Sequence, residues 1–275
     1  MHSSEKRAYP VQRLTDRLLQ FDDPITATCY LLLGDEKNLL IDTGSGEPEE
    51  FRQLLLPYRD KPLVLAITHA HADHYANAGI PGLFTAAYMH PKDIAILPEM
   101  NDYFVFAMAE QGRAVLPEML TPLREDQDFD LGGVHVRTLP LPGHSPGSVC
   151  FHVPELNMLF TGDAVGSGEE FWMQLPQCLT LKEYVGHLER FLDALPSPEV
   201  KLMGGHSCQA GIPGQPGYHP MNYDAIRELA EVCRRLVAGD NTLNVFKPEA
   251  EHLDDGVRKV IYQQTQMLFR PNRIR

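Results

Sequence analysis

The sequence predicts an α/β protein in which two β-sheets pack face to face and helices cover their outer faces. Two observations support this prediction. Short apolar segments that favour strands fall into two groups, one in each half of the chain, and each group contains a hairpin. Segments with helical spacing of their apolar residues lie between and after these groups. We expect a single domain over residues 1–275, a length that can bury a substantial core.

The first group of strands lies in the first third of the chain. Its hairpin turns at residues 34–37, between two runs rich in leucine. An Asp-Thr-Gly break after the second run ends that strand. The expected elements are strands over 25–33, 38–41 and 63–68, a helix over 49–56, and a mainly helical insertion over about 91–123.

The second half of the chain repeats this pattern. Its hairpin is expected around residues 154–157. The expected elements are strands over 134–139, 148–153, 158–161 and 200–203, and helices over 181–195, 223–237 and 257–269. The last two helices would make residues from about 220 to 275 a C-terminal helical region.

Residues of the kind that bind metals stand just past the ends of four predicted strands. The segment from Thr68 to His74 packs three histidines and one aspartate directly after an apolar run, and His144, Asp163 and His206 follow three other strands. Imidazole nitrogen and carboxylate oxygen are usual ligands of zinc and similar ions. Loops at one edge of a sheet can bring such side chains together. The sequence therefore predicts a metal site shared by four loops.

The order of these residues resembles the motifs of the metallo-β-lactamase-fold superfamily. The matching motifs are His69-x-His71-x-Asp73-His74, Gly143-His144-Ser145, Phe160-Thr161-Gly162-Asp163 and Gly204-Gly205-His206. The resemblance spans the chain from Thr26 to His206. It implies an αββα sandwich of two mixed β-sheets, with helices on the outer faces and a dinuclear metal site at one edge.

Carried over position by position, the resemblance assigns ligands to two metals. The first metal would bind His69, His71 and His144. The second would bind Asp73, His74 and His206, and Asp163 would bridge the two. The expected cofactors are two Zn²⁺ ions, with Mn²⁺ or Fe as alternatives. Asp42, at the end of a strand, resembles the acid that takes the other N–H of a ligand imidazole in this family.

The expected chemistry is hydrolysis by activated water. Two divalent ions about 3.5–4 Å apart can share a bridging hydroxide and lower its pKa towards neutrality. That hydroxide would attack a small ester, thioester or lactone-like substrate, and Asp73 would also act as the catalytic base. Phe171 and Trp172 follow Asp163 closely and are candidates for the rim of the substrate pocket.

The resemblance leaves other reactions open. The full ligand set favours a zinc-dependent hydrolase of the hydroxyacylglutathione-hydrolase-like branch over a true β-lactamase, which usually lacks the bridging aspartate. Persulfide dioxygenases have a nearly identical motif but bind a single iron, and that alternative would leave His69, His144 and Asp163 on the iron. Phosphodiesterase or β-lactamase activity at the same two metals is a further alternative.

Composition bears on partners and compartment. The formal net charge of −13 argues against a nucleic-acid partner. No segment approaches the ~20 apolar residues that a membrane span needs, and the N-terminus leads into no apolar run typical of a secretory signal. The five cysteines form no Cys-x-x-Cys pair, which fits a reducing compartment. We expect a cytoplasmic enzyme acting on a small molecule, with a homodimer as an open alternative.

Overall fold

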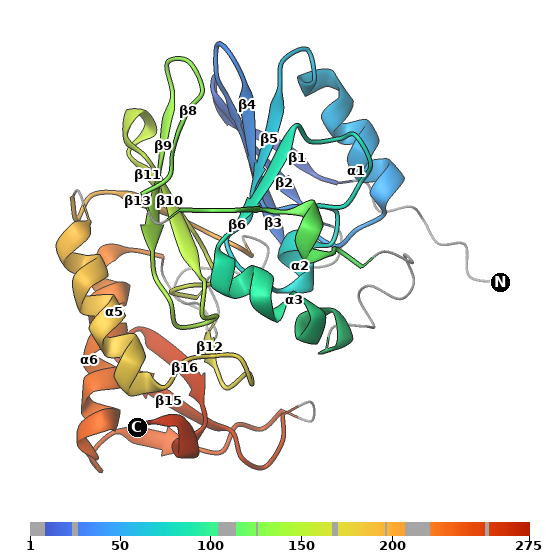
Figure 1. Cartoon of the computed structure of the whole chain (residues 1–275). Coiled ribbons are helices and arrows are strands. Elements are labelled where there is room, and N and C mark those ends of the chain that lie inside the picture. The colour runs from blue at the N-terminus through green and yellow to red at the C-terminus, as the bar shows by residue number, and fades with distance from the viewer. Residues whose placement is uncertain are drawn as a thin grey trace.

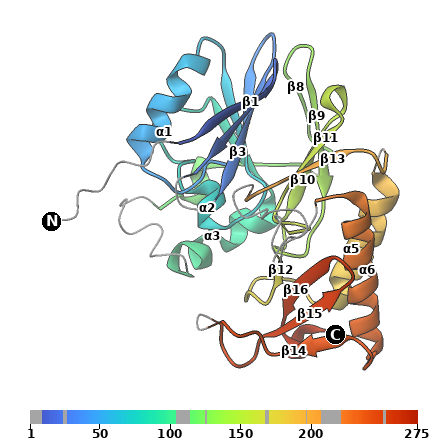
Figure 2. The same cartoon turned by 180° about the vertical axis from the view of Figure 1, so that it is seen from behind.

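A computed structural model of the chain describes residues 9–23, 27–103, 114–124, 126–166, 170–195, 197–206, 221–250 and 253–275 (Figures 1 and 2). Its main body consists of two β-sheets packed against each other. The first sheet has the order β1 (Val11–Thr15), β2 (Leu18–Asp22), β3 (Thr28–Leu33), β4 (Asn38–Ile41), β5 (Leu63–Ala66), β6 (Ala86–Met89) and β7 (Thr121–Pro122). Strands β1 to β4 are antiparallel, whereas β4 to β7 are parallel, so the sheet is mixed.

The second sheet comes from the other half of the chain. Its order is β13 (Lys201–Gly204), β11 (Met158–Gly162), β10 (Val149–Val153), β9 (His135–Pro140) and β8 (Asp128–Asp130). The hairpins predicted around residues 34–37 and 154–157 are confirmed, because β3 pairs antiparallel with β4 and β10 pairs antiparallel with β11. Strand β13 joins β11 in parallel. Strands β1 and β2 were not predicted.

Helices cover the outer face of each sheet (Figure 1). Helices α1 (Pro48–Leu55), α2 (Ala72–Tyr75) and α3 (Pro91–Tyr103) pack on the first sheet, and α5 (Leu181–Ala194) and α6 (Tyr223–Ala238) pack on the second. Short 3₁₀ turns lie at Leu56–Tyr58, Pro117–Met119, Pro154–Leu156 and Pro271–Arg273. None of these described helices has the length and apolarity needed to cross a membrane.

Alternating side chains on the strands explain the layers. On β3, Tyr30 and Leu32 belong to the core between the two sheets, while Leu31 belongs to the core under the helices. On β10, Phe151 joins the same inter-sheet core and Cys150 faces α5 and α6. Since successive residues of a strand point to opposite faces, strands buried on both sides must be apolar throughout. The predicted αββα sandwich is therefore confirmed.

The C-terminal part of the chain differs from the prediction. Residues 257–269 form no helix, and that prediction was wrong. They form a hairpin of β15 (Arg258–Tyr262) and β16 (Thr265–Phe269), with Gln263 at a positive φ of 52° in the turn. With β12 (Phe171–Met173) and β14 (Asn244–Phe246), the hairpin makes a third sheet in the order β12-β16-β15-β14. β-branched and aromatic residues beside a tight turn favour this arrangement, and the sheet packs against α6.

The insertion over 91–123 is only partly helical. Helix α3 fills its first part, and a 3₁₀ turn and β7 fill its last part. Residues 104–113 lie outside the described residues, as does residue 220 at the start of the predicted C-terminal region.

Candidate metal centre

The ends of the central strands from both sheets meet at one rim. Because β4 and β5 are parallel, Asp42 lies beside Thr68 just past the strand ends. Because β11 and β13 are parallel, Asp163 lies beside the Gly204–His206 segment. Hydrogen bonds between the sheets here run from Val149 N–H to the carbonyl of Thr68 (3.0 Å), from Tyr30 Oη to the carbonyl of Gly204 (2.7 Å) and from Thr28 N–H to the carbonyl of Gly205 (2.7 Å). Hydrogen bonds to backbone carbonyls therefore hold the rim together.

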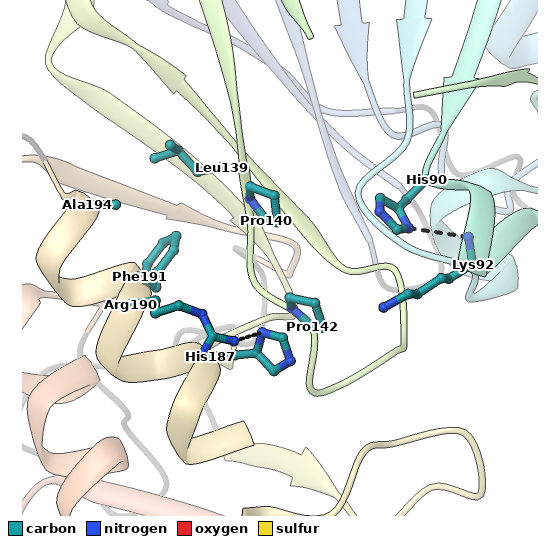
Figure 3. A pocket seen from close by; sticks show the side chains of 9 residues that line it. All are labelled: His90, Lys92, Leu139, Pro140, Pro142, His187, Arg190, Phe191 and Ala194. Carbon is teal, nitrogen blue, oxygen red and sulfur yellow. Dashed lines mark hydrogen bonds between the residues drawn. The ribbon is translucent and has the colours of Figure 1, made fainter. Parts of the chain in front are cut away.

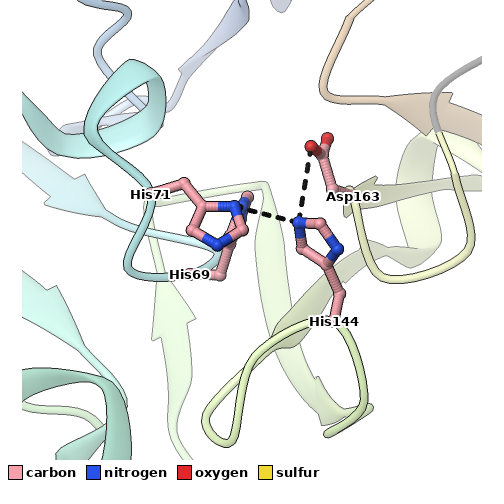
Figure 4. Close-up of side chains that lie close together, drawn as sticks. All are labelled: His69, His71, His144 and Asp163. Carbon is pink, nitrogen blue, oxygen red and sulfur yellow. Dashed lines mark hydrogen bonds and ion pairs between the residues drawn. The ribbon is translucent and has the colours of Figure 1, made fainter. Parts of the chain in front are cut away.

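Four predicted ligands form a first cluster (Figure 4). Nε2 of His69 and Nε2 of His144 each lie 2.9 Å from Nδ1 of His71. Oδ2 of Asp163 lies 3.7 Å from Nε2 of His144. One donor atom from each of the four residues falls within 4.8 Å of all the others, so they can share one metal ion.

The remaining three predicted ligands form a second cluster. Nε2 of His74 lies 3.3 Å from Nε2 of His206, and Oδ2 of Asp73 lies 3.6 Å from the first of these nitrogens and 3.5 Å from the second. The two clusters touch through Asp163, whose Oδ2 is 3.1 Å from Nε2 of His206 and 3.7 Å from Nε2 of His74. The structure thus brings all seven predicted residues together, in the same two groups. That they bind metal stays a prediction.

Outside the clusters, other groups fix the tautomer of two imidazoles. His144 donates from Nδ1 to the carbonyl of Trp172 at 2.8 Å, and His74 donates from Nδ1 to Oδ2 of Asp42 at 2.9 Å. A neutral imidazole that donates through Nδ1 presents a lone pair at Nε2. Both Nε2 atoms therefore point into the centre, and each neutral ring would offer its lone pair to a metal ion there.

Asp42 also acts on His69, through Thr68. The fully buried Asp42 carboxylate accepts from Thr68 N–H (2.7 Å) and from the Thr68 hydroxyl (2.8 Å). Since that hydroxyl donates its proton to Asp42, its oxygen can only accept from Nδ1–H of His69, 3.0 Å away. The predicted position of Asp42 beside a ligand imidazole agrees with the structure, and its link to a second one was not foreseen.

His71 is oriented by Gln177, which the sequence did not indicate. His71 faces the cluster with Nδ1, so its proton belongs on Nε2, and the Gln177 side-chain amide is in hydrogen-bond contact with that nitrogen. The Gln177 atom in contact is the amide nitrogen Nε2, a donor like the protonated His71 nitrogen, so we assign the amide turned by 180°, with its oxygen accepting this proton. This pairing also satisfies Oε1 of Gln177, a buried oxygen that otherwise has no partner among the described residues. All three imidazoles of the first cluster thus have an outer partner.

Asp93 ties two ligand loops together and was also missed. It is fully buried near the start of α3, where its carboxylate accepts from Ala70 N–H (2.8 Å), between two ligand histidines. It also accepts from the Ser145 hydroxyl (2.6 Å) and from Gly147 N–H (2.6 Å), in the loop of His144. Its sequence signal was available: Asp93 follows β6, which ends at the same rim as β5.

The first cluster contains neutral imidazoles. Burial, reinforced by the neighbouring imidazoles, lowers the pKa of His69 and His71 well below the usual value, and burial also lowers the pKa of His144. Three neutral rings then present lone pairs to one another at short range. Such an arrangement is unfavourable without a shared cation, so the donor set fits a metal ion.

The second cluster is charged instead. Burial opposes charge on His74, but the carboxylates of Asp73 and Asp163 outweigh it and raise its pKa well above the usual value. In the same way Asp163 raises the pKa of His206 to about 9 against the effect of burial. Without metal, protons hold this cluster together, and a metal ion would take their place.

Close packing of backbone completes the centre. A Cβ added at Gly205 would lie 2.4 Å from Oδ1 of Asp163 and 2.7 Å from Cε1 of His74. Glycine before His206 therefore lets the β13 loop approach both clusters.

The two predicted pocket residues have different positions. Trp172 is 40% exposed, and its carbonyl holds His144. Phe171 is fully buried and packs against Tyr184, with ring centroids 5.2 Å apart. Phe171 therefore packs in the core beside the centre, and its role at the pocket rim stays a prediction. The pocket role of Trp172 stays a prediction.

Comparisons with known proteins cover the part of the chain that contains the two clusters. The family model of the metallo-beta-lactamase superfamily matches residues 22–231. The acyl-coenzyme A thioesterase MBLAC2 of Homo sapiens is 28% identical over 66% of this chain and 72% of its own length. The lactamase-like protein ptaB of Pestalotiopsis fici is 27% identical over 75% of this chain, and the match spans 56% of that relative's length.

Solved structures show the same fold. A metallo-beta-lactamase family protein from Thermus thermophilus aligns with a TM-score of 0.62 over 82% of each chain, at 22% identity. TTHA1623, crystallised in a di-iron-bound form, is 31% identical and aligns with a TM-score of 0.52 over 67% of this chain and 89% of its own.

Proposed function

The chain belongs to the metallo-beta-lactamase superfamily, and we propose that it is a dinuclear metal-dependent hydrolase whose substrate is a small thioester. The observation that carries the proposal is the position of Asp163 Oδ2 between two clusters of ligand atoms, 3.7 Å from Nε2 of His144 and 3.1 Å from Nε2 of His206. A carboxylate oxygen in contact with both clusters suits a bridge between two cations.

The substrate class is supported by the printed names of relatives. Human MBLAC2 is an acyl-coenzyme A thioesterase, and an atrochrysone carboxyl ACP thioesterase of Aspergillus terreus is 30% identical over 50% of this chain and 38% of its own length. Both are named for hydrolysing thioesters, and the two carriers differ. For this chain we propose the small-molecule carrier, coenzyme A.

Zinc is the proposed metal. Three imidazole nitrogens with one carboxylate are a usual donor set for Zn²⁺, although the same donors suit iron. When bound, the two ions would supply an activated water and polarise the thioester carbonyl.

The chain's own residues would then position ligands and move protons. Asp73 is the most exposed of the seven ligand-type side chains, at 27% against 16% for Asp163 and 0% for His74. It is therefore the carboxylate best placed to take a proton from water and return it to the leaving thiol. Asp42, Gln177 and the Trp172 carbonyl keep the ligand imidazoles in their productive tautomers.

A mononuclear iron dioxygenase is the competing proposal. It would need only His69, His144 and Asp163 on the metal. The second cluster, with Asp73, His74 and His206 in mutual contact, favours two metals.

The test is a substrate panel with metal-loaded protein. Thiol release from acyl-coenzyme A is followed beside a lactone, nitrocefin and bis-p-nitrophenyl phosphate. We expect thioester hydrolysis that His69→Ala abolishes, and that the matched control His135→Ala retains, because His135 is an exposed histidine paired with Glu155 outside the two ligand clusters. Thioester turnover no faster than with His69→Ala, together with oxygen uptake on glutathione persulfide, would overturn the proposal.

A further inference from the structure

A cavity of about 350 Å³ opens beside the loop of His144 (Figure 3). One wall is α5, which contributes His187, Arg190 and Phe191, and the opposite wall is the start of α3 with Lys92. The end of β9 and the loop after it, with Pro142, lie between the walls. None of the seven ligand-type residues lines this cavity.

Basic groups converge in this cavity although the chain is strongly acidic overall. Figure 3 shows the Lys92 ammonium and the Arg190 guanidinium reaching towards the same space from opposite walls. Arg190 donates from Nη2 to Nδ1 of His187 at 2.9 Å, which leaves the single proton of a neutral His187 on Nε2 as a further donor. Burial, Arg190 and Lys92 together lower the pKa of His187, so the positive potential of the two cations extends into the cavity.

Acids nearby in sequence form no ion pair with these cations. Glu183 closes the N-terminus of α5 by bonding Thr180, and Glu189 pairs with Arg234 at 3.2 Å. The Asp93 carboxylate is buried and accepts three hydrogen bonds from the ligand loops. Within the described part of the chain, neither Lys92 nor Arg190 has a carboxylate at ion-pair distance. The cavity thus has positive charge available for a ligand.

The donors suit a phosphate group. A guanidinium fork facing an ammonium, with an imidazole N–H beside them, offers several charge-assisted hydrogen bonds to one dianion. Leu139, Pro140 and Pro142 add apolar surface for the body of the ligand. The volume lies at the lower end of the range for ligand sites, roughly 300–1,000 Å³, which fits one end of a larger molecule.

The cavity is also close to the metal centre along the chain. Pro142 stands two residues before His144, so their Cα atoms are at most about 7 Å apart. Lys92 directly precedes Asp93, whose carboxylate holds the loops of Ala70 and Gly147. A ligand in the cavity would contact the outer side of the same loop that presents His144 to the metal.

We propose that this cavity binds the phosphate-bearing end of the substrate's carrier. The inference rests on the proposed function, because a coenzyme A thioester carries phosphates at the end remote from its acyl group. A separate phosphorylated ligand has the same chemistry, and the kinetic arm below distinguishes the two sources.

The binding arm uses adenosine 3′,5′-bisphosphate as the probe and isothermal titration of the metal-loaded protein. In the double variant Lys92→Gln/Arg190→Gln we expect Kd to rise at least about tenfold, as for loss of charge-assisted hydrogen bonds. Lys182→Gln, an exposed lysine of α5 outside the cavity, is the matched control and should leave Kd unchanged. An unchanged Kd in the double variant would overturn the proposal.

The kinetic arm compares acyl-coenzyme A with the acyl-pantetheine of the same chain length, which lacks phosphate. A carrier-borne phosphate predicts that the double variant raises KM for acyl-coenzyme A at least about tenfold, with kcat and the kinetics of acyl-pantetheine unchanged. Bisphosphate binding that is lost in the double variant without any change in KM assigns the phosphate to a separate ligand and overturns the carrier assignment. If neither thioester is hydrolysed, the proposed function is wrong. The binding arm then still shows whether the cavity binds phosphate.

Discussion

Replacing Asp42 by asparagine should disturb both metal clusters while preserving the shape of the site. Asparagine has the same shape as aspartate, and its Oδ1 can still accept from Thr68 N–H. Its Nδ2 would replace Oδ2 opposite the Thr68 hydroxyl and Nδ1 of His74, and an amide nitrogen cannot accept a hydrogen bond. The change is therefore confined to one acceptor.

Two imidazoles should change tautomer in response. The neutral His74 that binds metal loses the acceptor for Nδ1–H, so the tautomer with its proton on Nε2, the nitrogen that faces His206, becomes favoured. The Thr68 hydroxyl, freed from Asp42, turns its proton towards Nδ1 of His69, whose own proton then moves to Nε2 in the first cluster. Loss of such an outer partner typically costs about 10–100-fold in metal affinity, or roughly 1.4–2.7 kcal/mol per site.

Metal affinity measured by competition with a fluorescent chelator, at both sites, checks this prediction. Asp23→Asn is the matched control, because Asp23 is also buried but bonds Ser45 rather than an imidazole. We expect Asp42→Asn to weaken both sites and the metal-free protein to lose about 1–3 kcal/mol of unfolding free energy. If Asp42→Asn keeps wild-type affinity at both sites, the tautomer argument is refuted.

Four further predictions concern single residues. Gln177→Leu should lower metal affinity about tenfold with a smaller loss in Gln177→Glu, and equal losses in the chelator assay would contradict the assigned acceptor. Asp93→Ala should weaken metal binding at the first site. It should also lower the unfolding free energy by about 3 kcal/mol, because three donors lose their partner, and denaturant unfolding without metal checks this. Because the pKa of His74 is raised well above its usual value and that of His206 to about 9, metal binding at pH 7 should release protons and tighten as pH rises towards 9. Titration in buffers of different ionisation enthalpy that detects no proton release would contradict the charged state of both rings. Gly186→Ala, inside α5 with its new Cβ 3.6 Å from Arg190, should raise the unfolding free energy by about 0.5–1 kcal/mol, and a loss would contradict the packing seen there.

The positions of the ligand residues were predictable because they depend on strand ends. Strands β5, β11 and β13 lie in short apolar runs and β9 alternates, and residues of the kind that bind metals follow each of them. Parallel strands end at the same edge of a sheet, and so do alternate strands of an antiparallel run. The carboxyl ends of these strands therefore lie at one rim. The resemblance to the motifs of the metallo-β-lactamase-fold superfamily then assigned the residues to the two groups that the structure shows.

The outer partners were harder to predict. The position of Asp93 after β6 could have placed it at the rim, but its contacts with the Ala70 and Gly147 amides depend on where α3 begins. Gln177 lies in an irregular segment between β12 and α5. Such a segment has no helical or strand period from which the direction of a side chain could be predicted. Such contacts arise from tertiary packing, which a single sequence does not reveal.

The C-terminal error has a related cause. The apolar positions of residues 257–269 fit both the helical period and the strand period. These residues form strands because β16 pairs with β12 from another part of the chain. Val260 and Met267 face each other in the hairpin and are fully buried. Pairing with a distant strand can override local helical spacing.

The central claim is that the two clusters hold two metal ions, and metal content tests it most directly. The protein is purified without chelator, reconstituted with Zn²⁺ and analysed by mass spectrometry for metals, beside His69→Ala and His206→Ala. We expect two zinc ions per chain, with the two variants losing metal from different clusters. A single tightly bound iron per chain that both His206→Ala and wild type retain equally would contradict it.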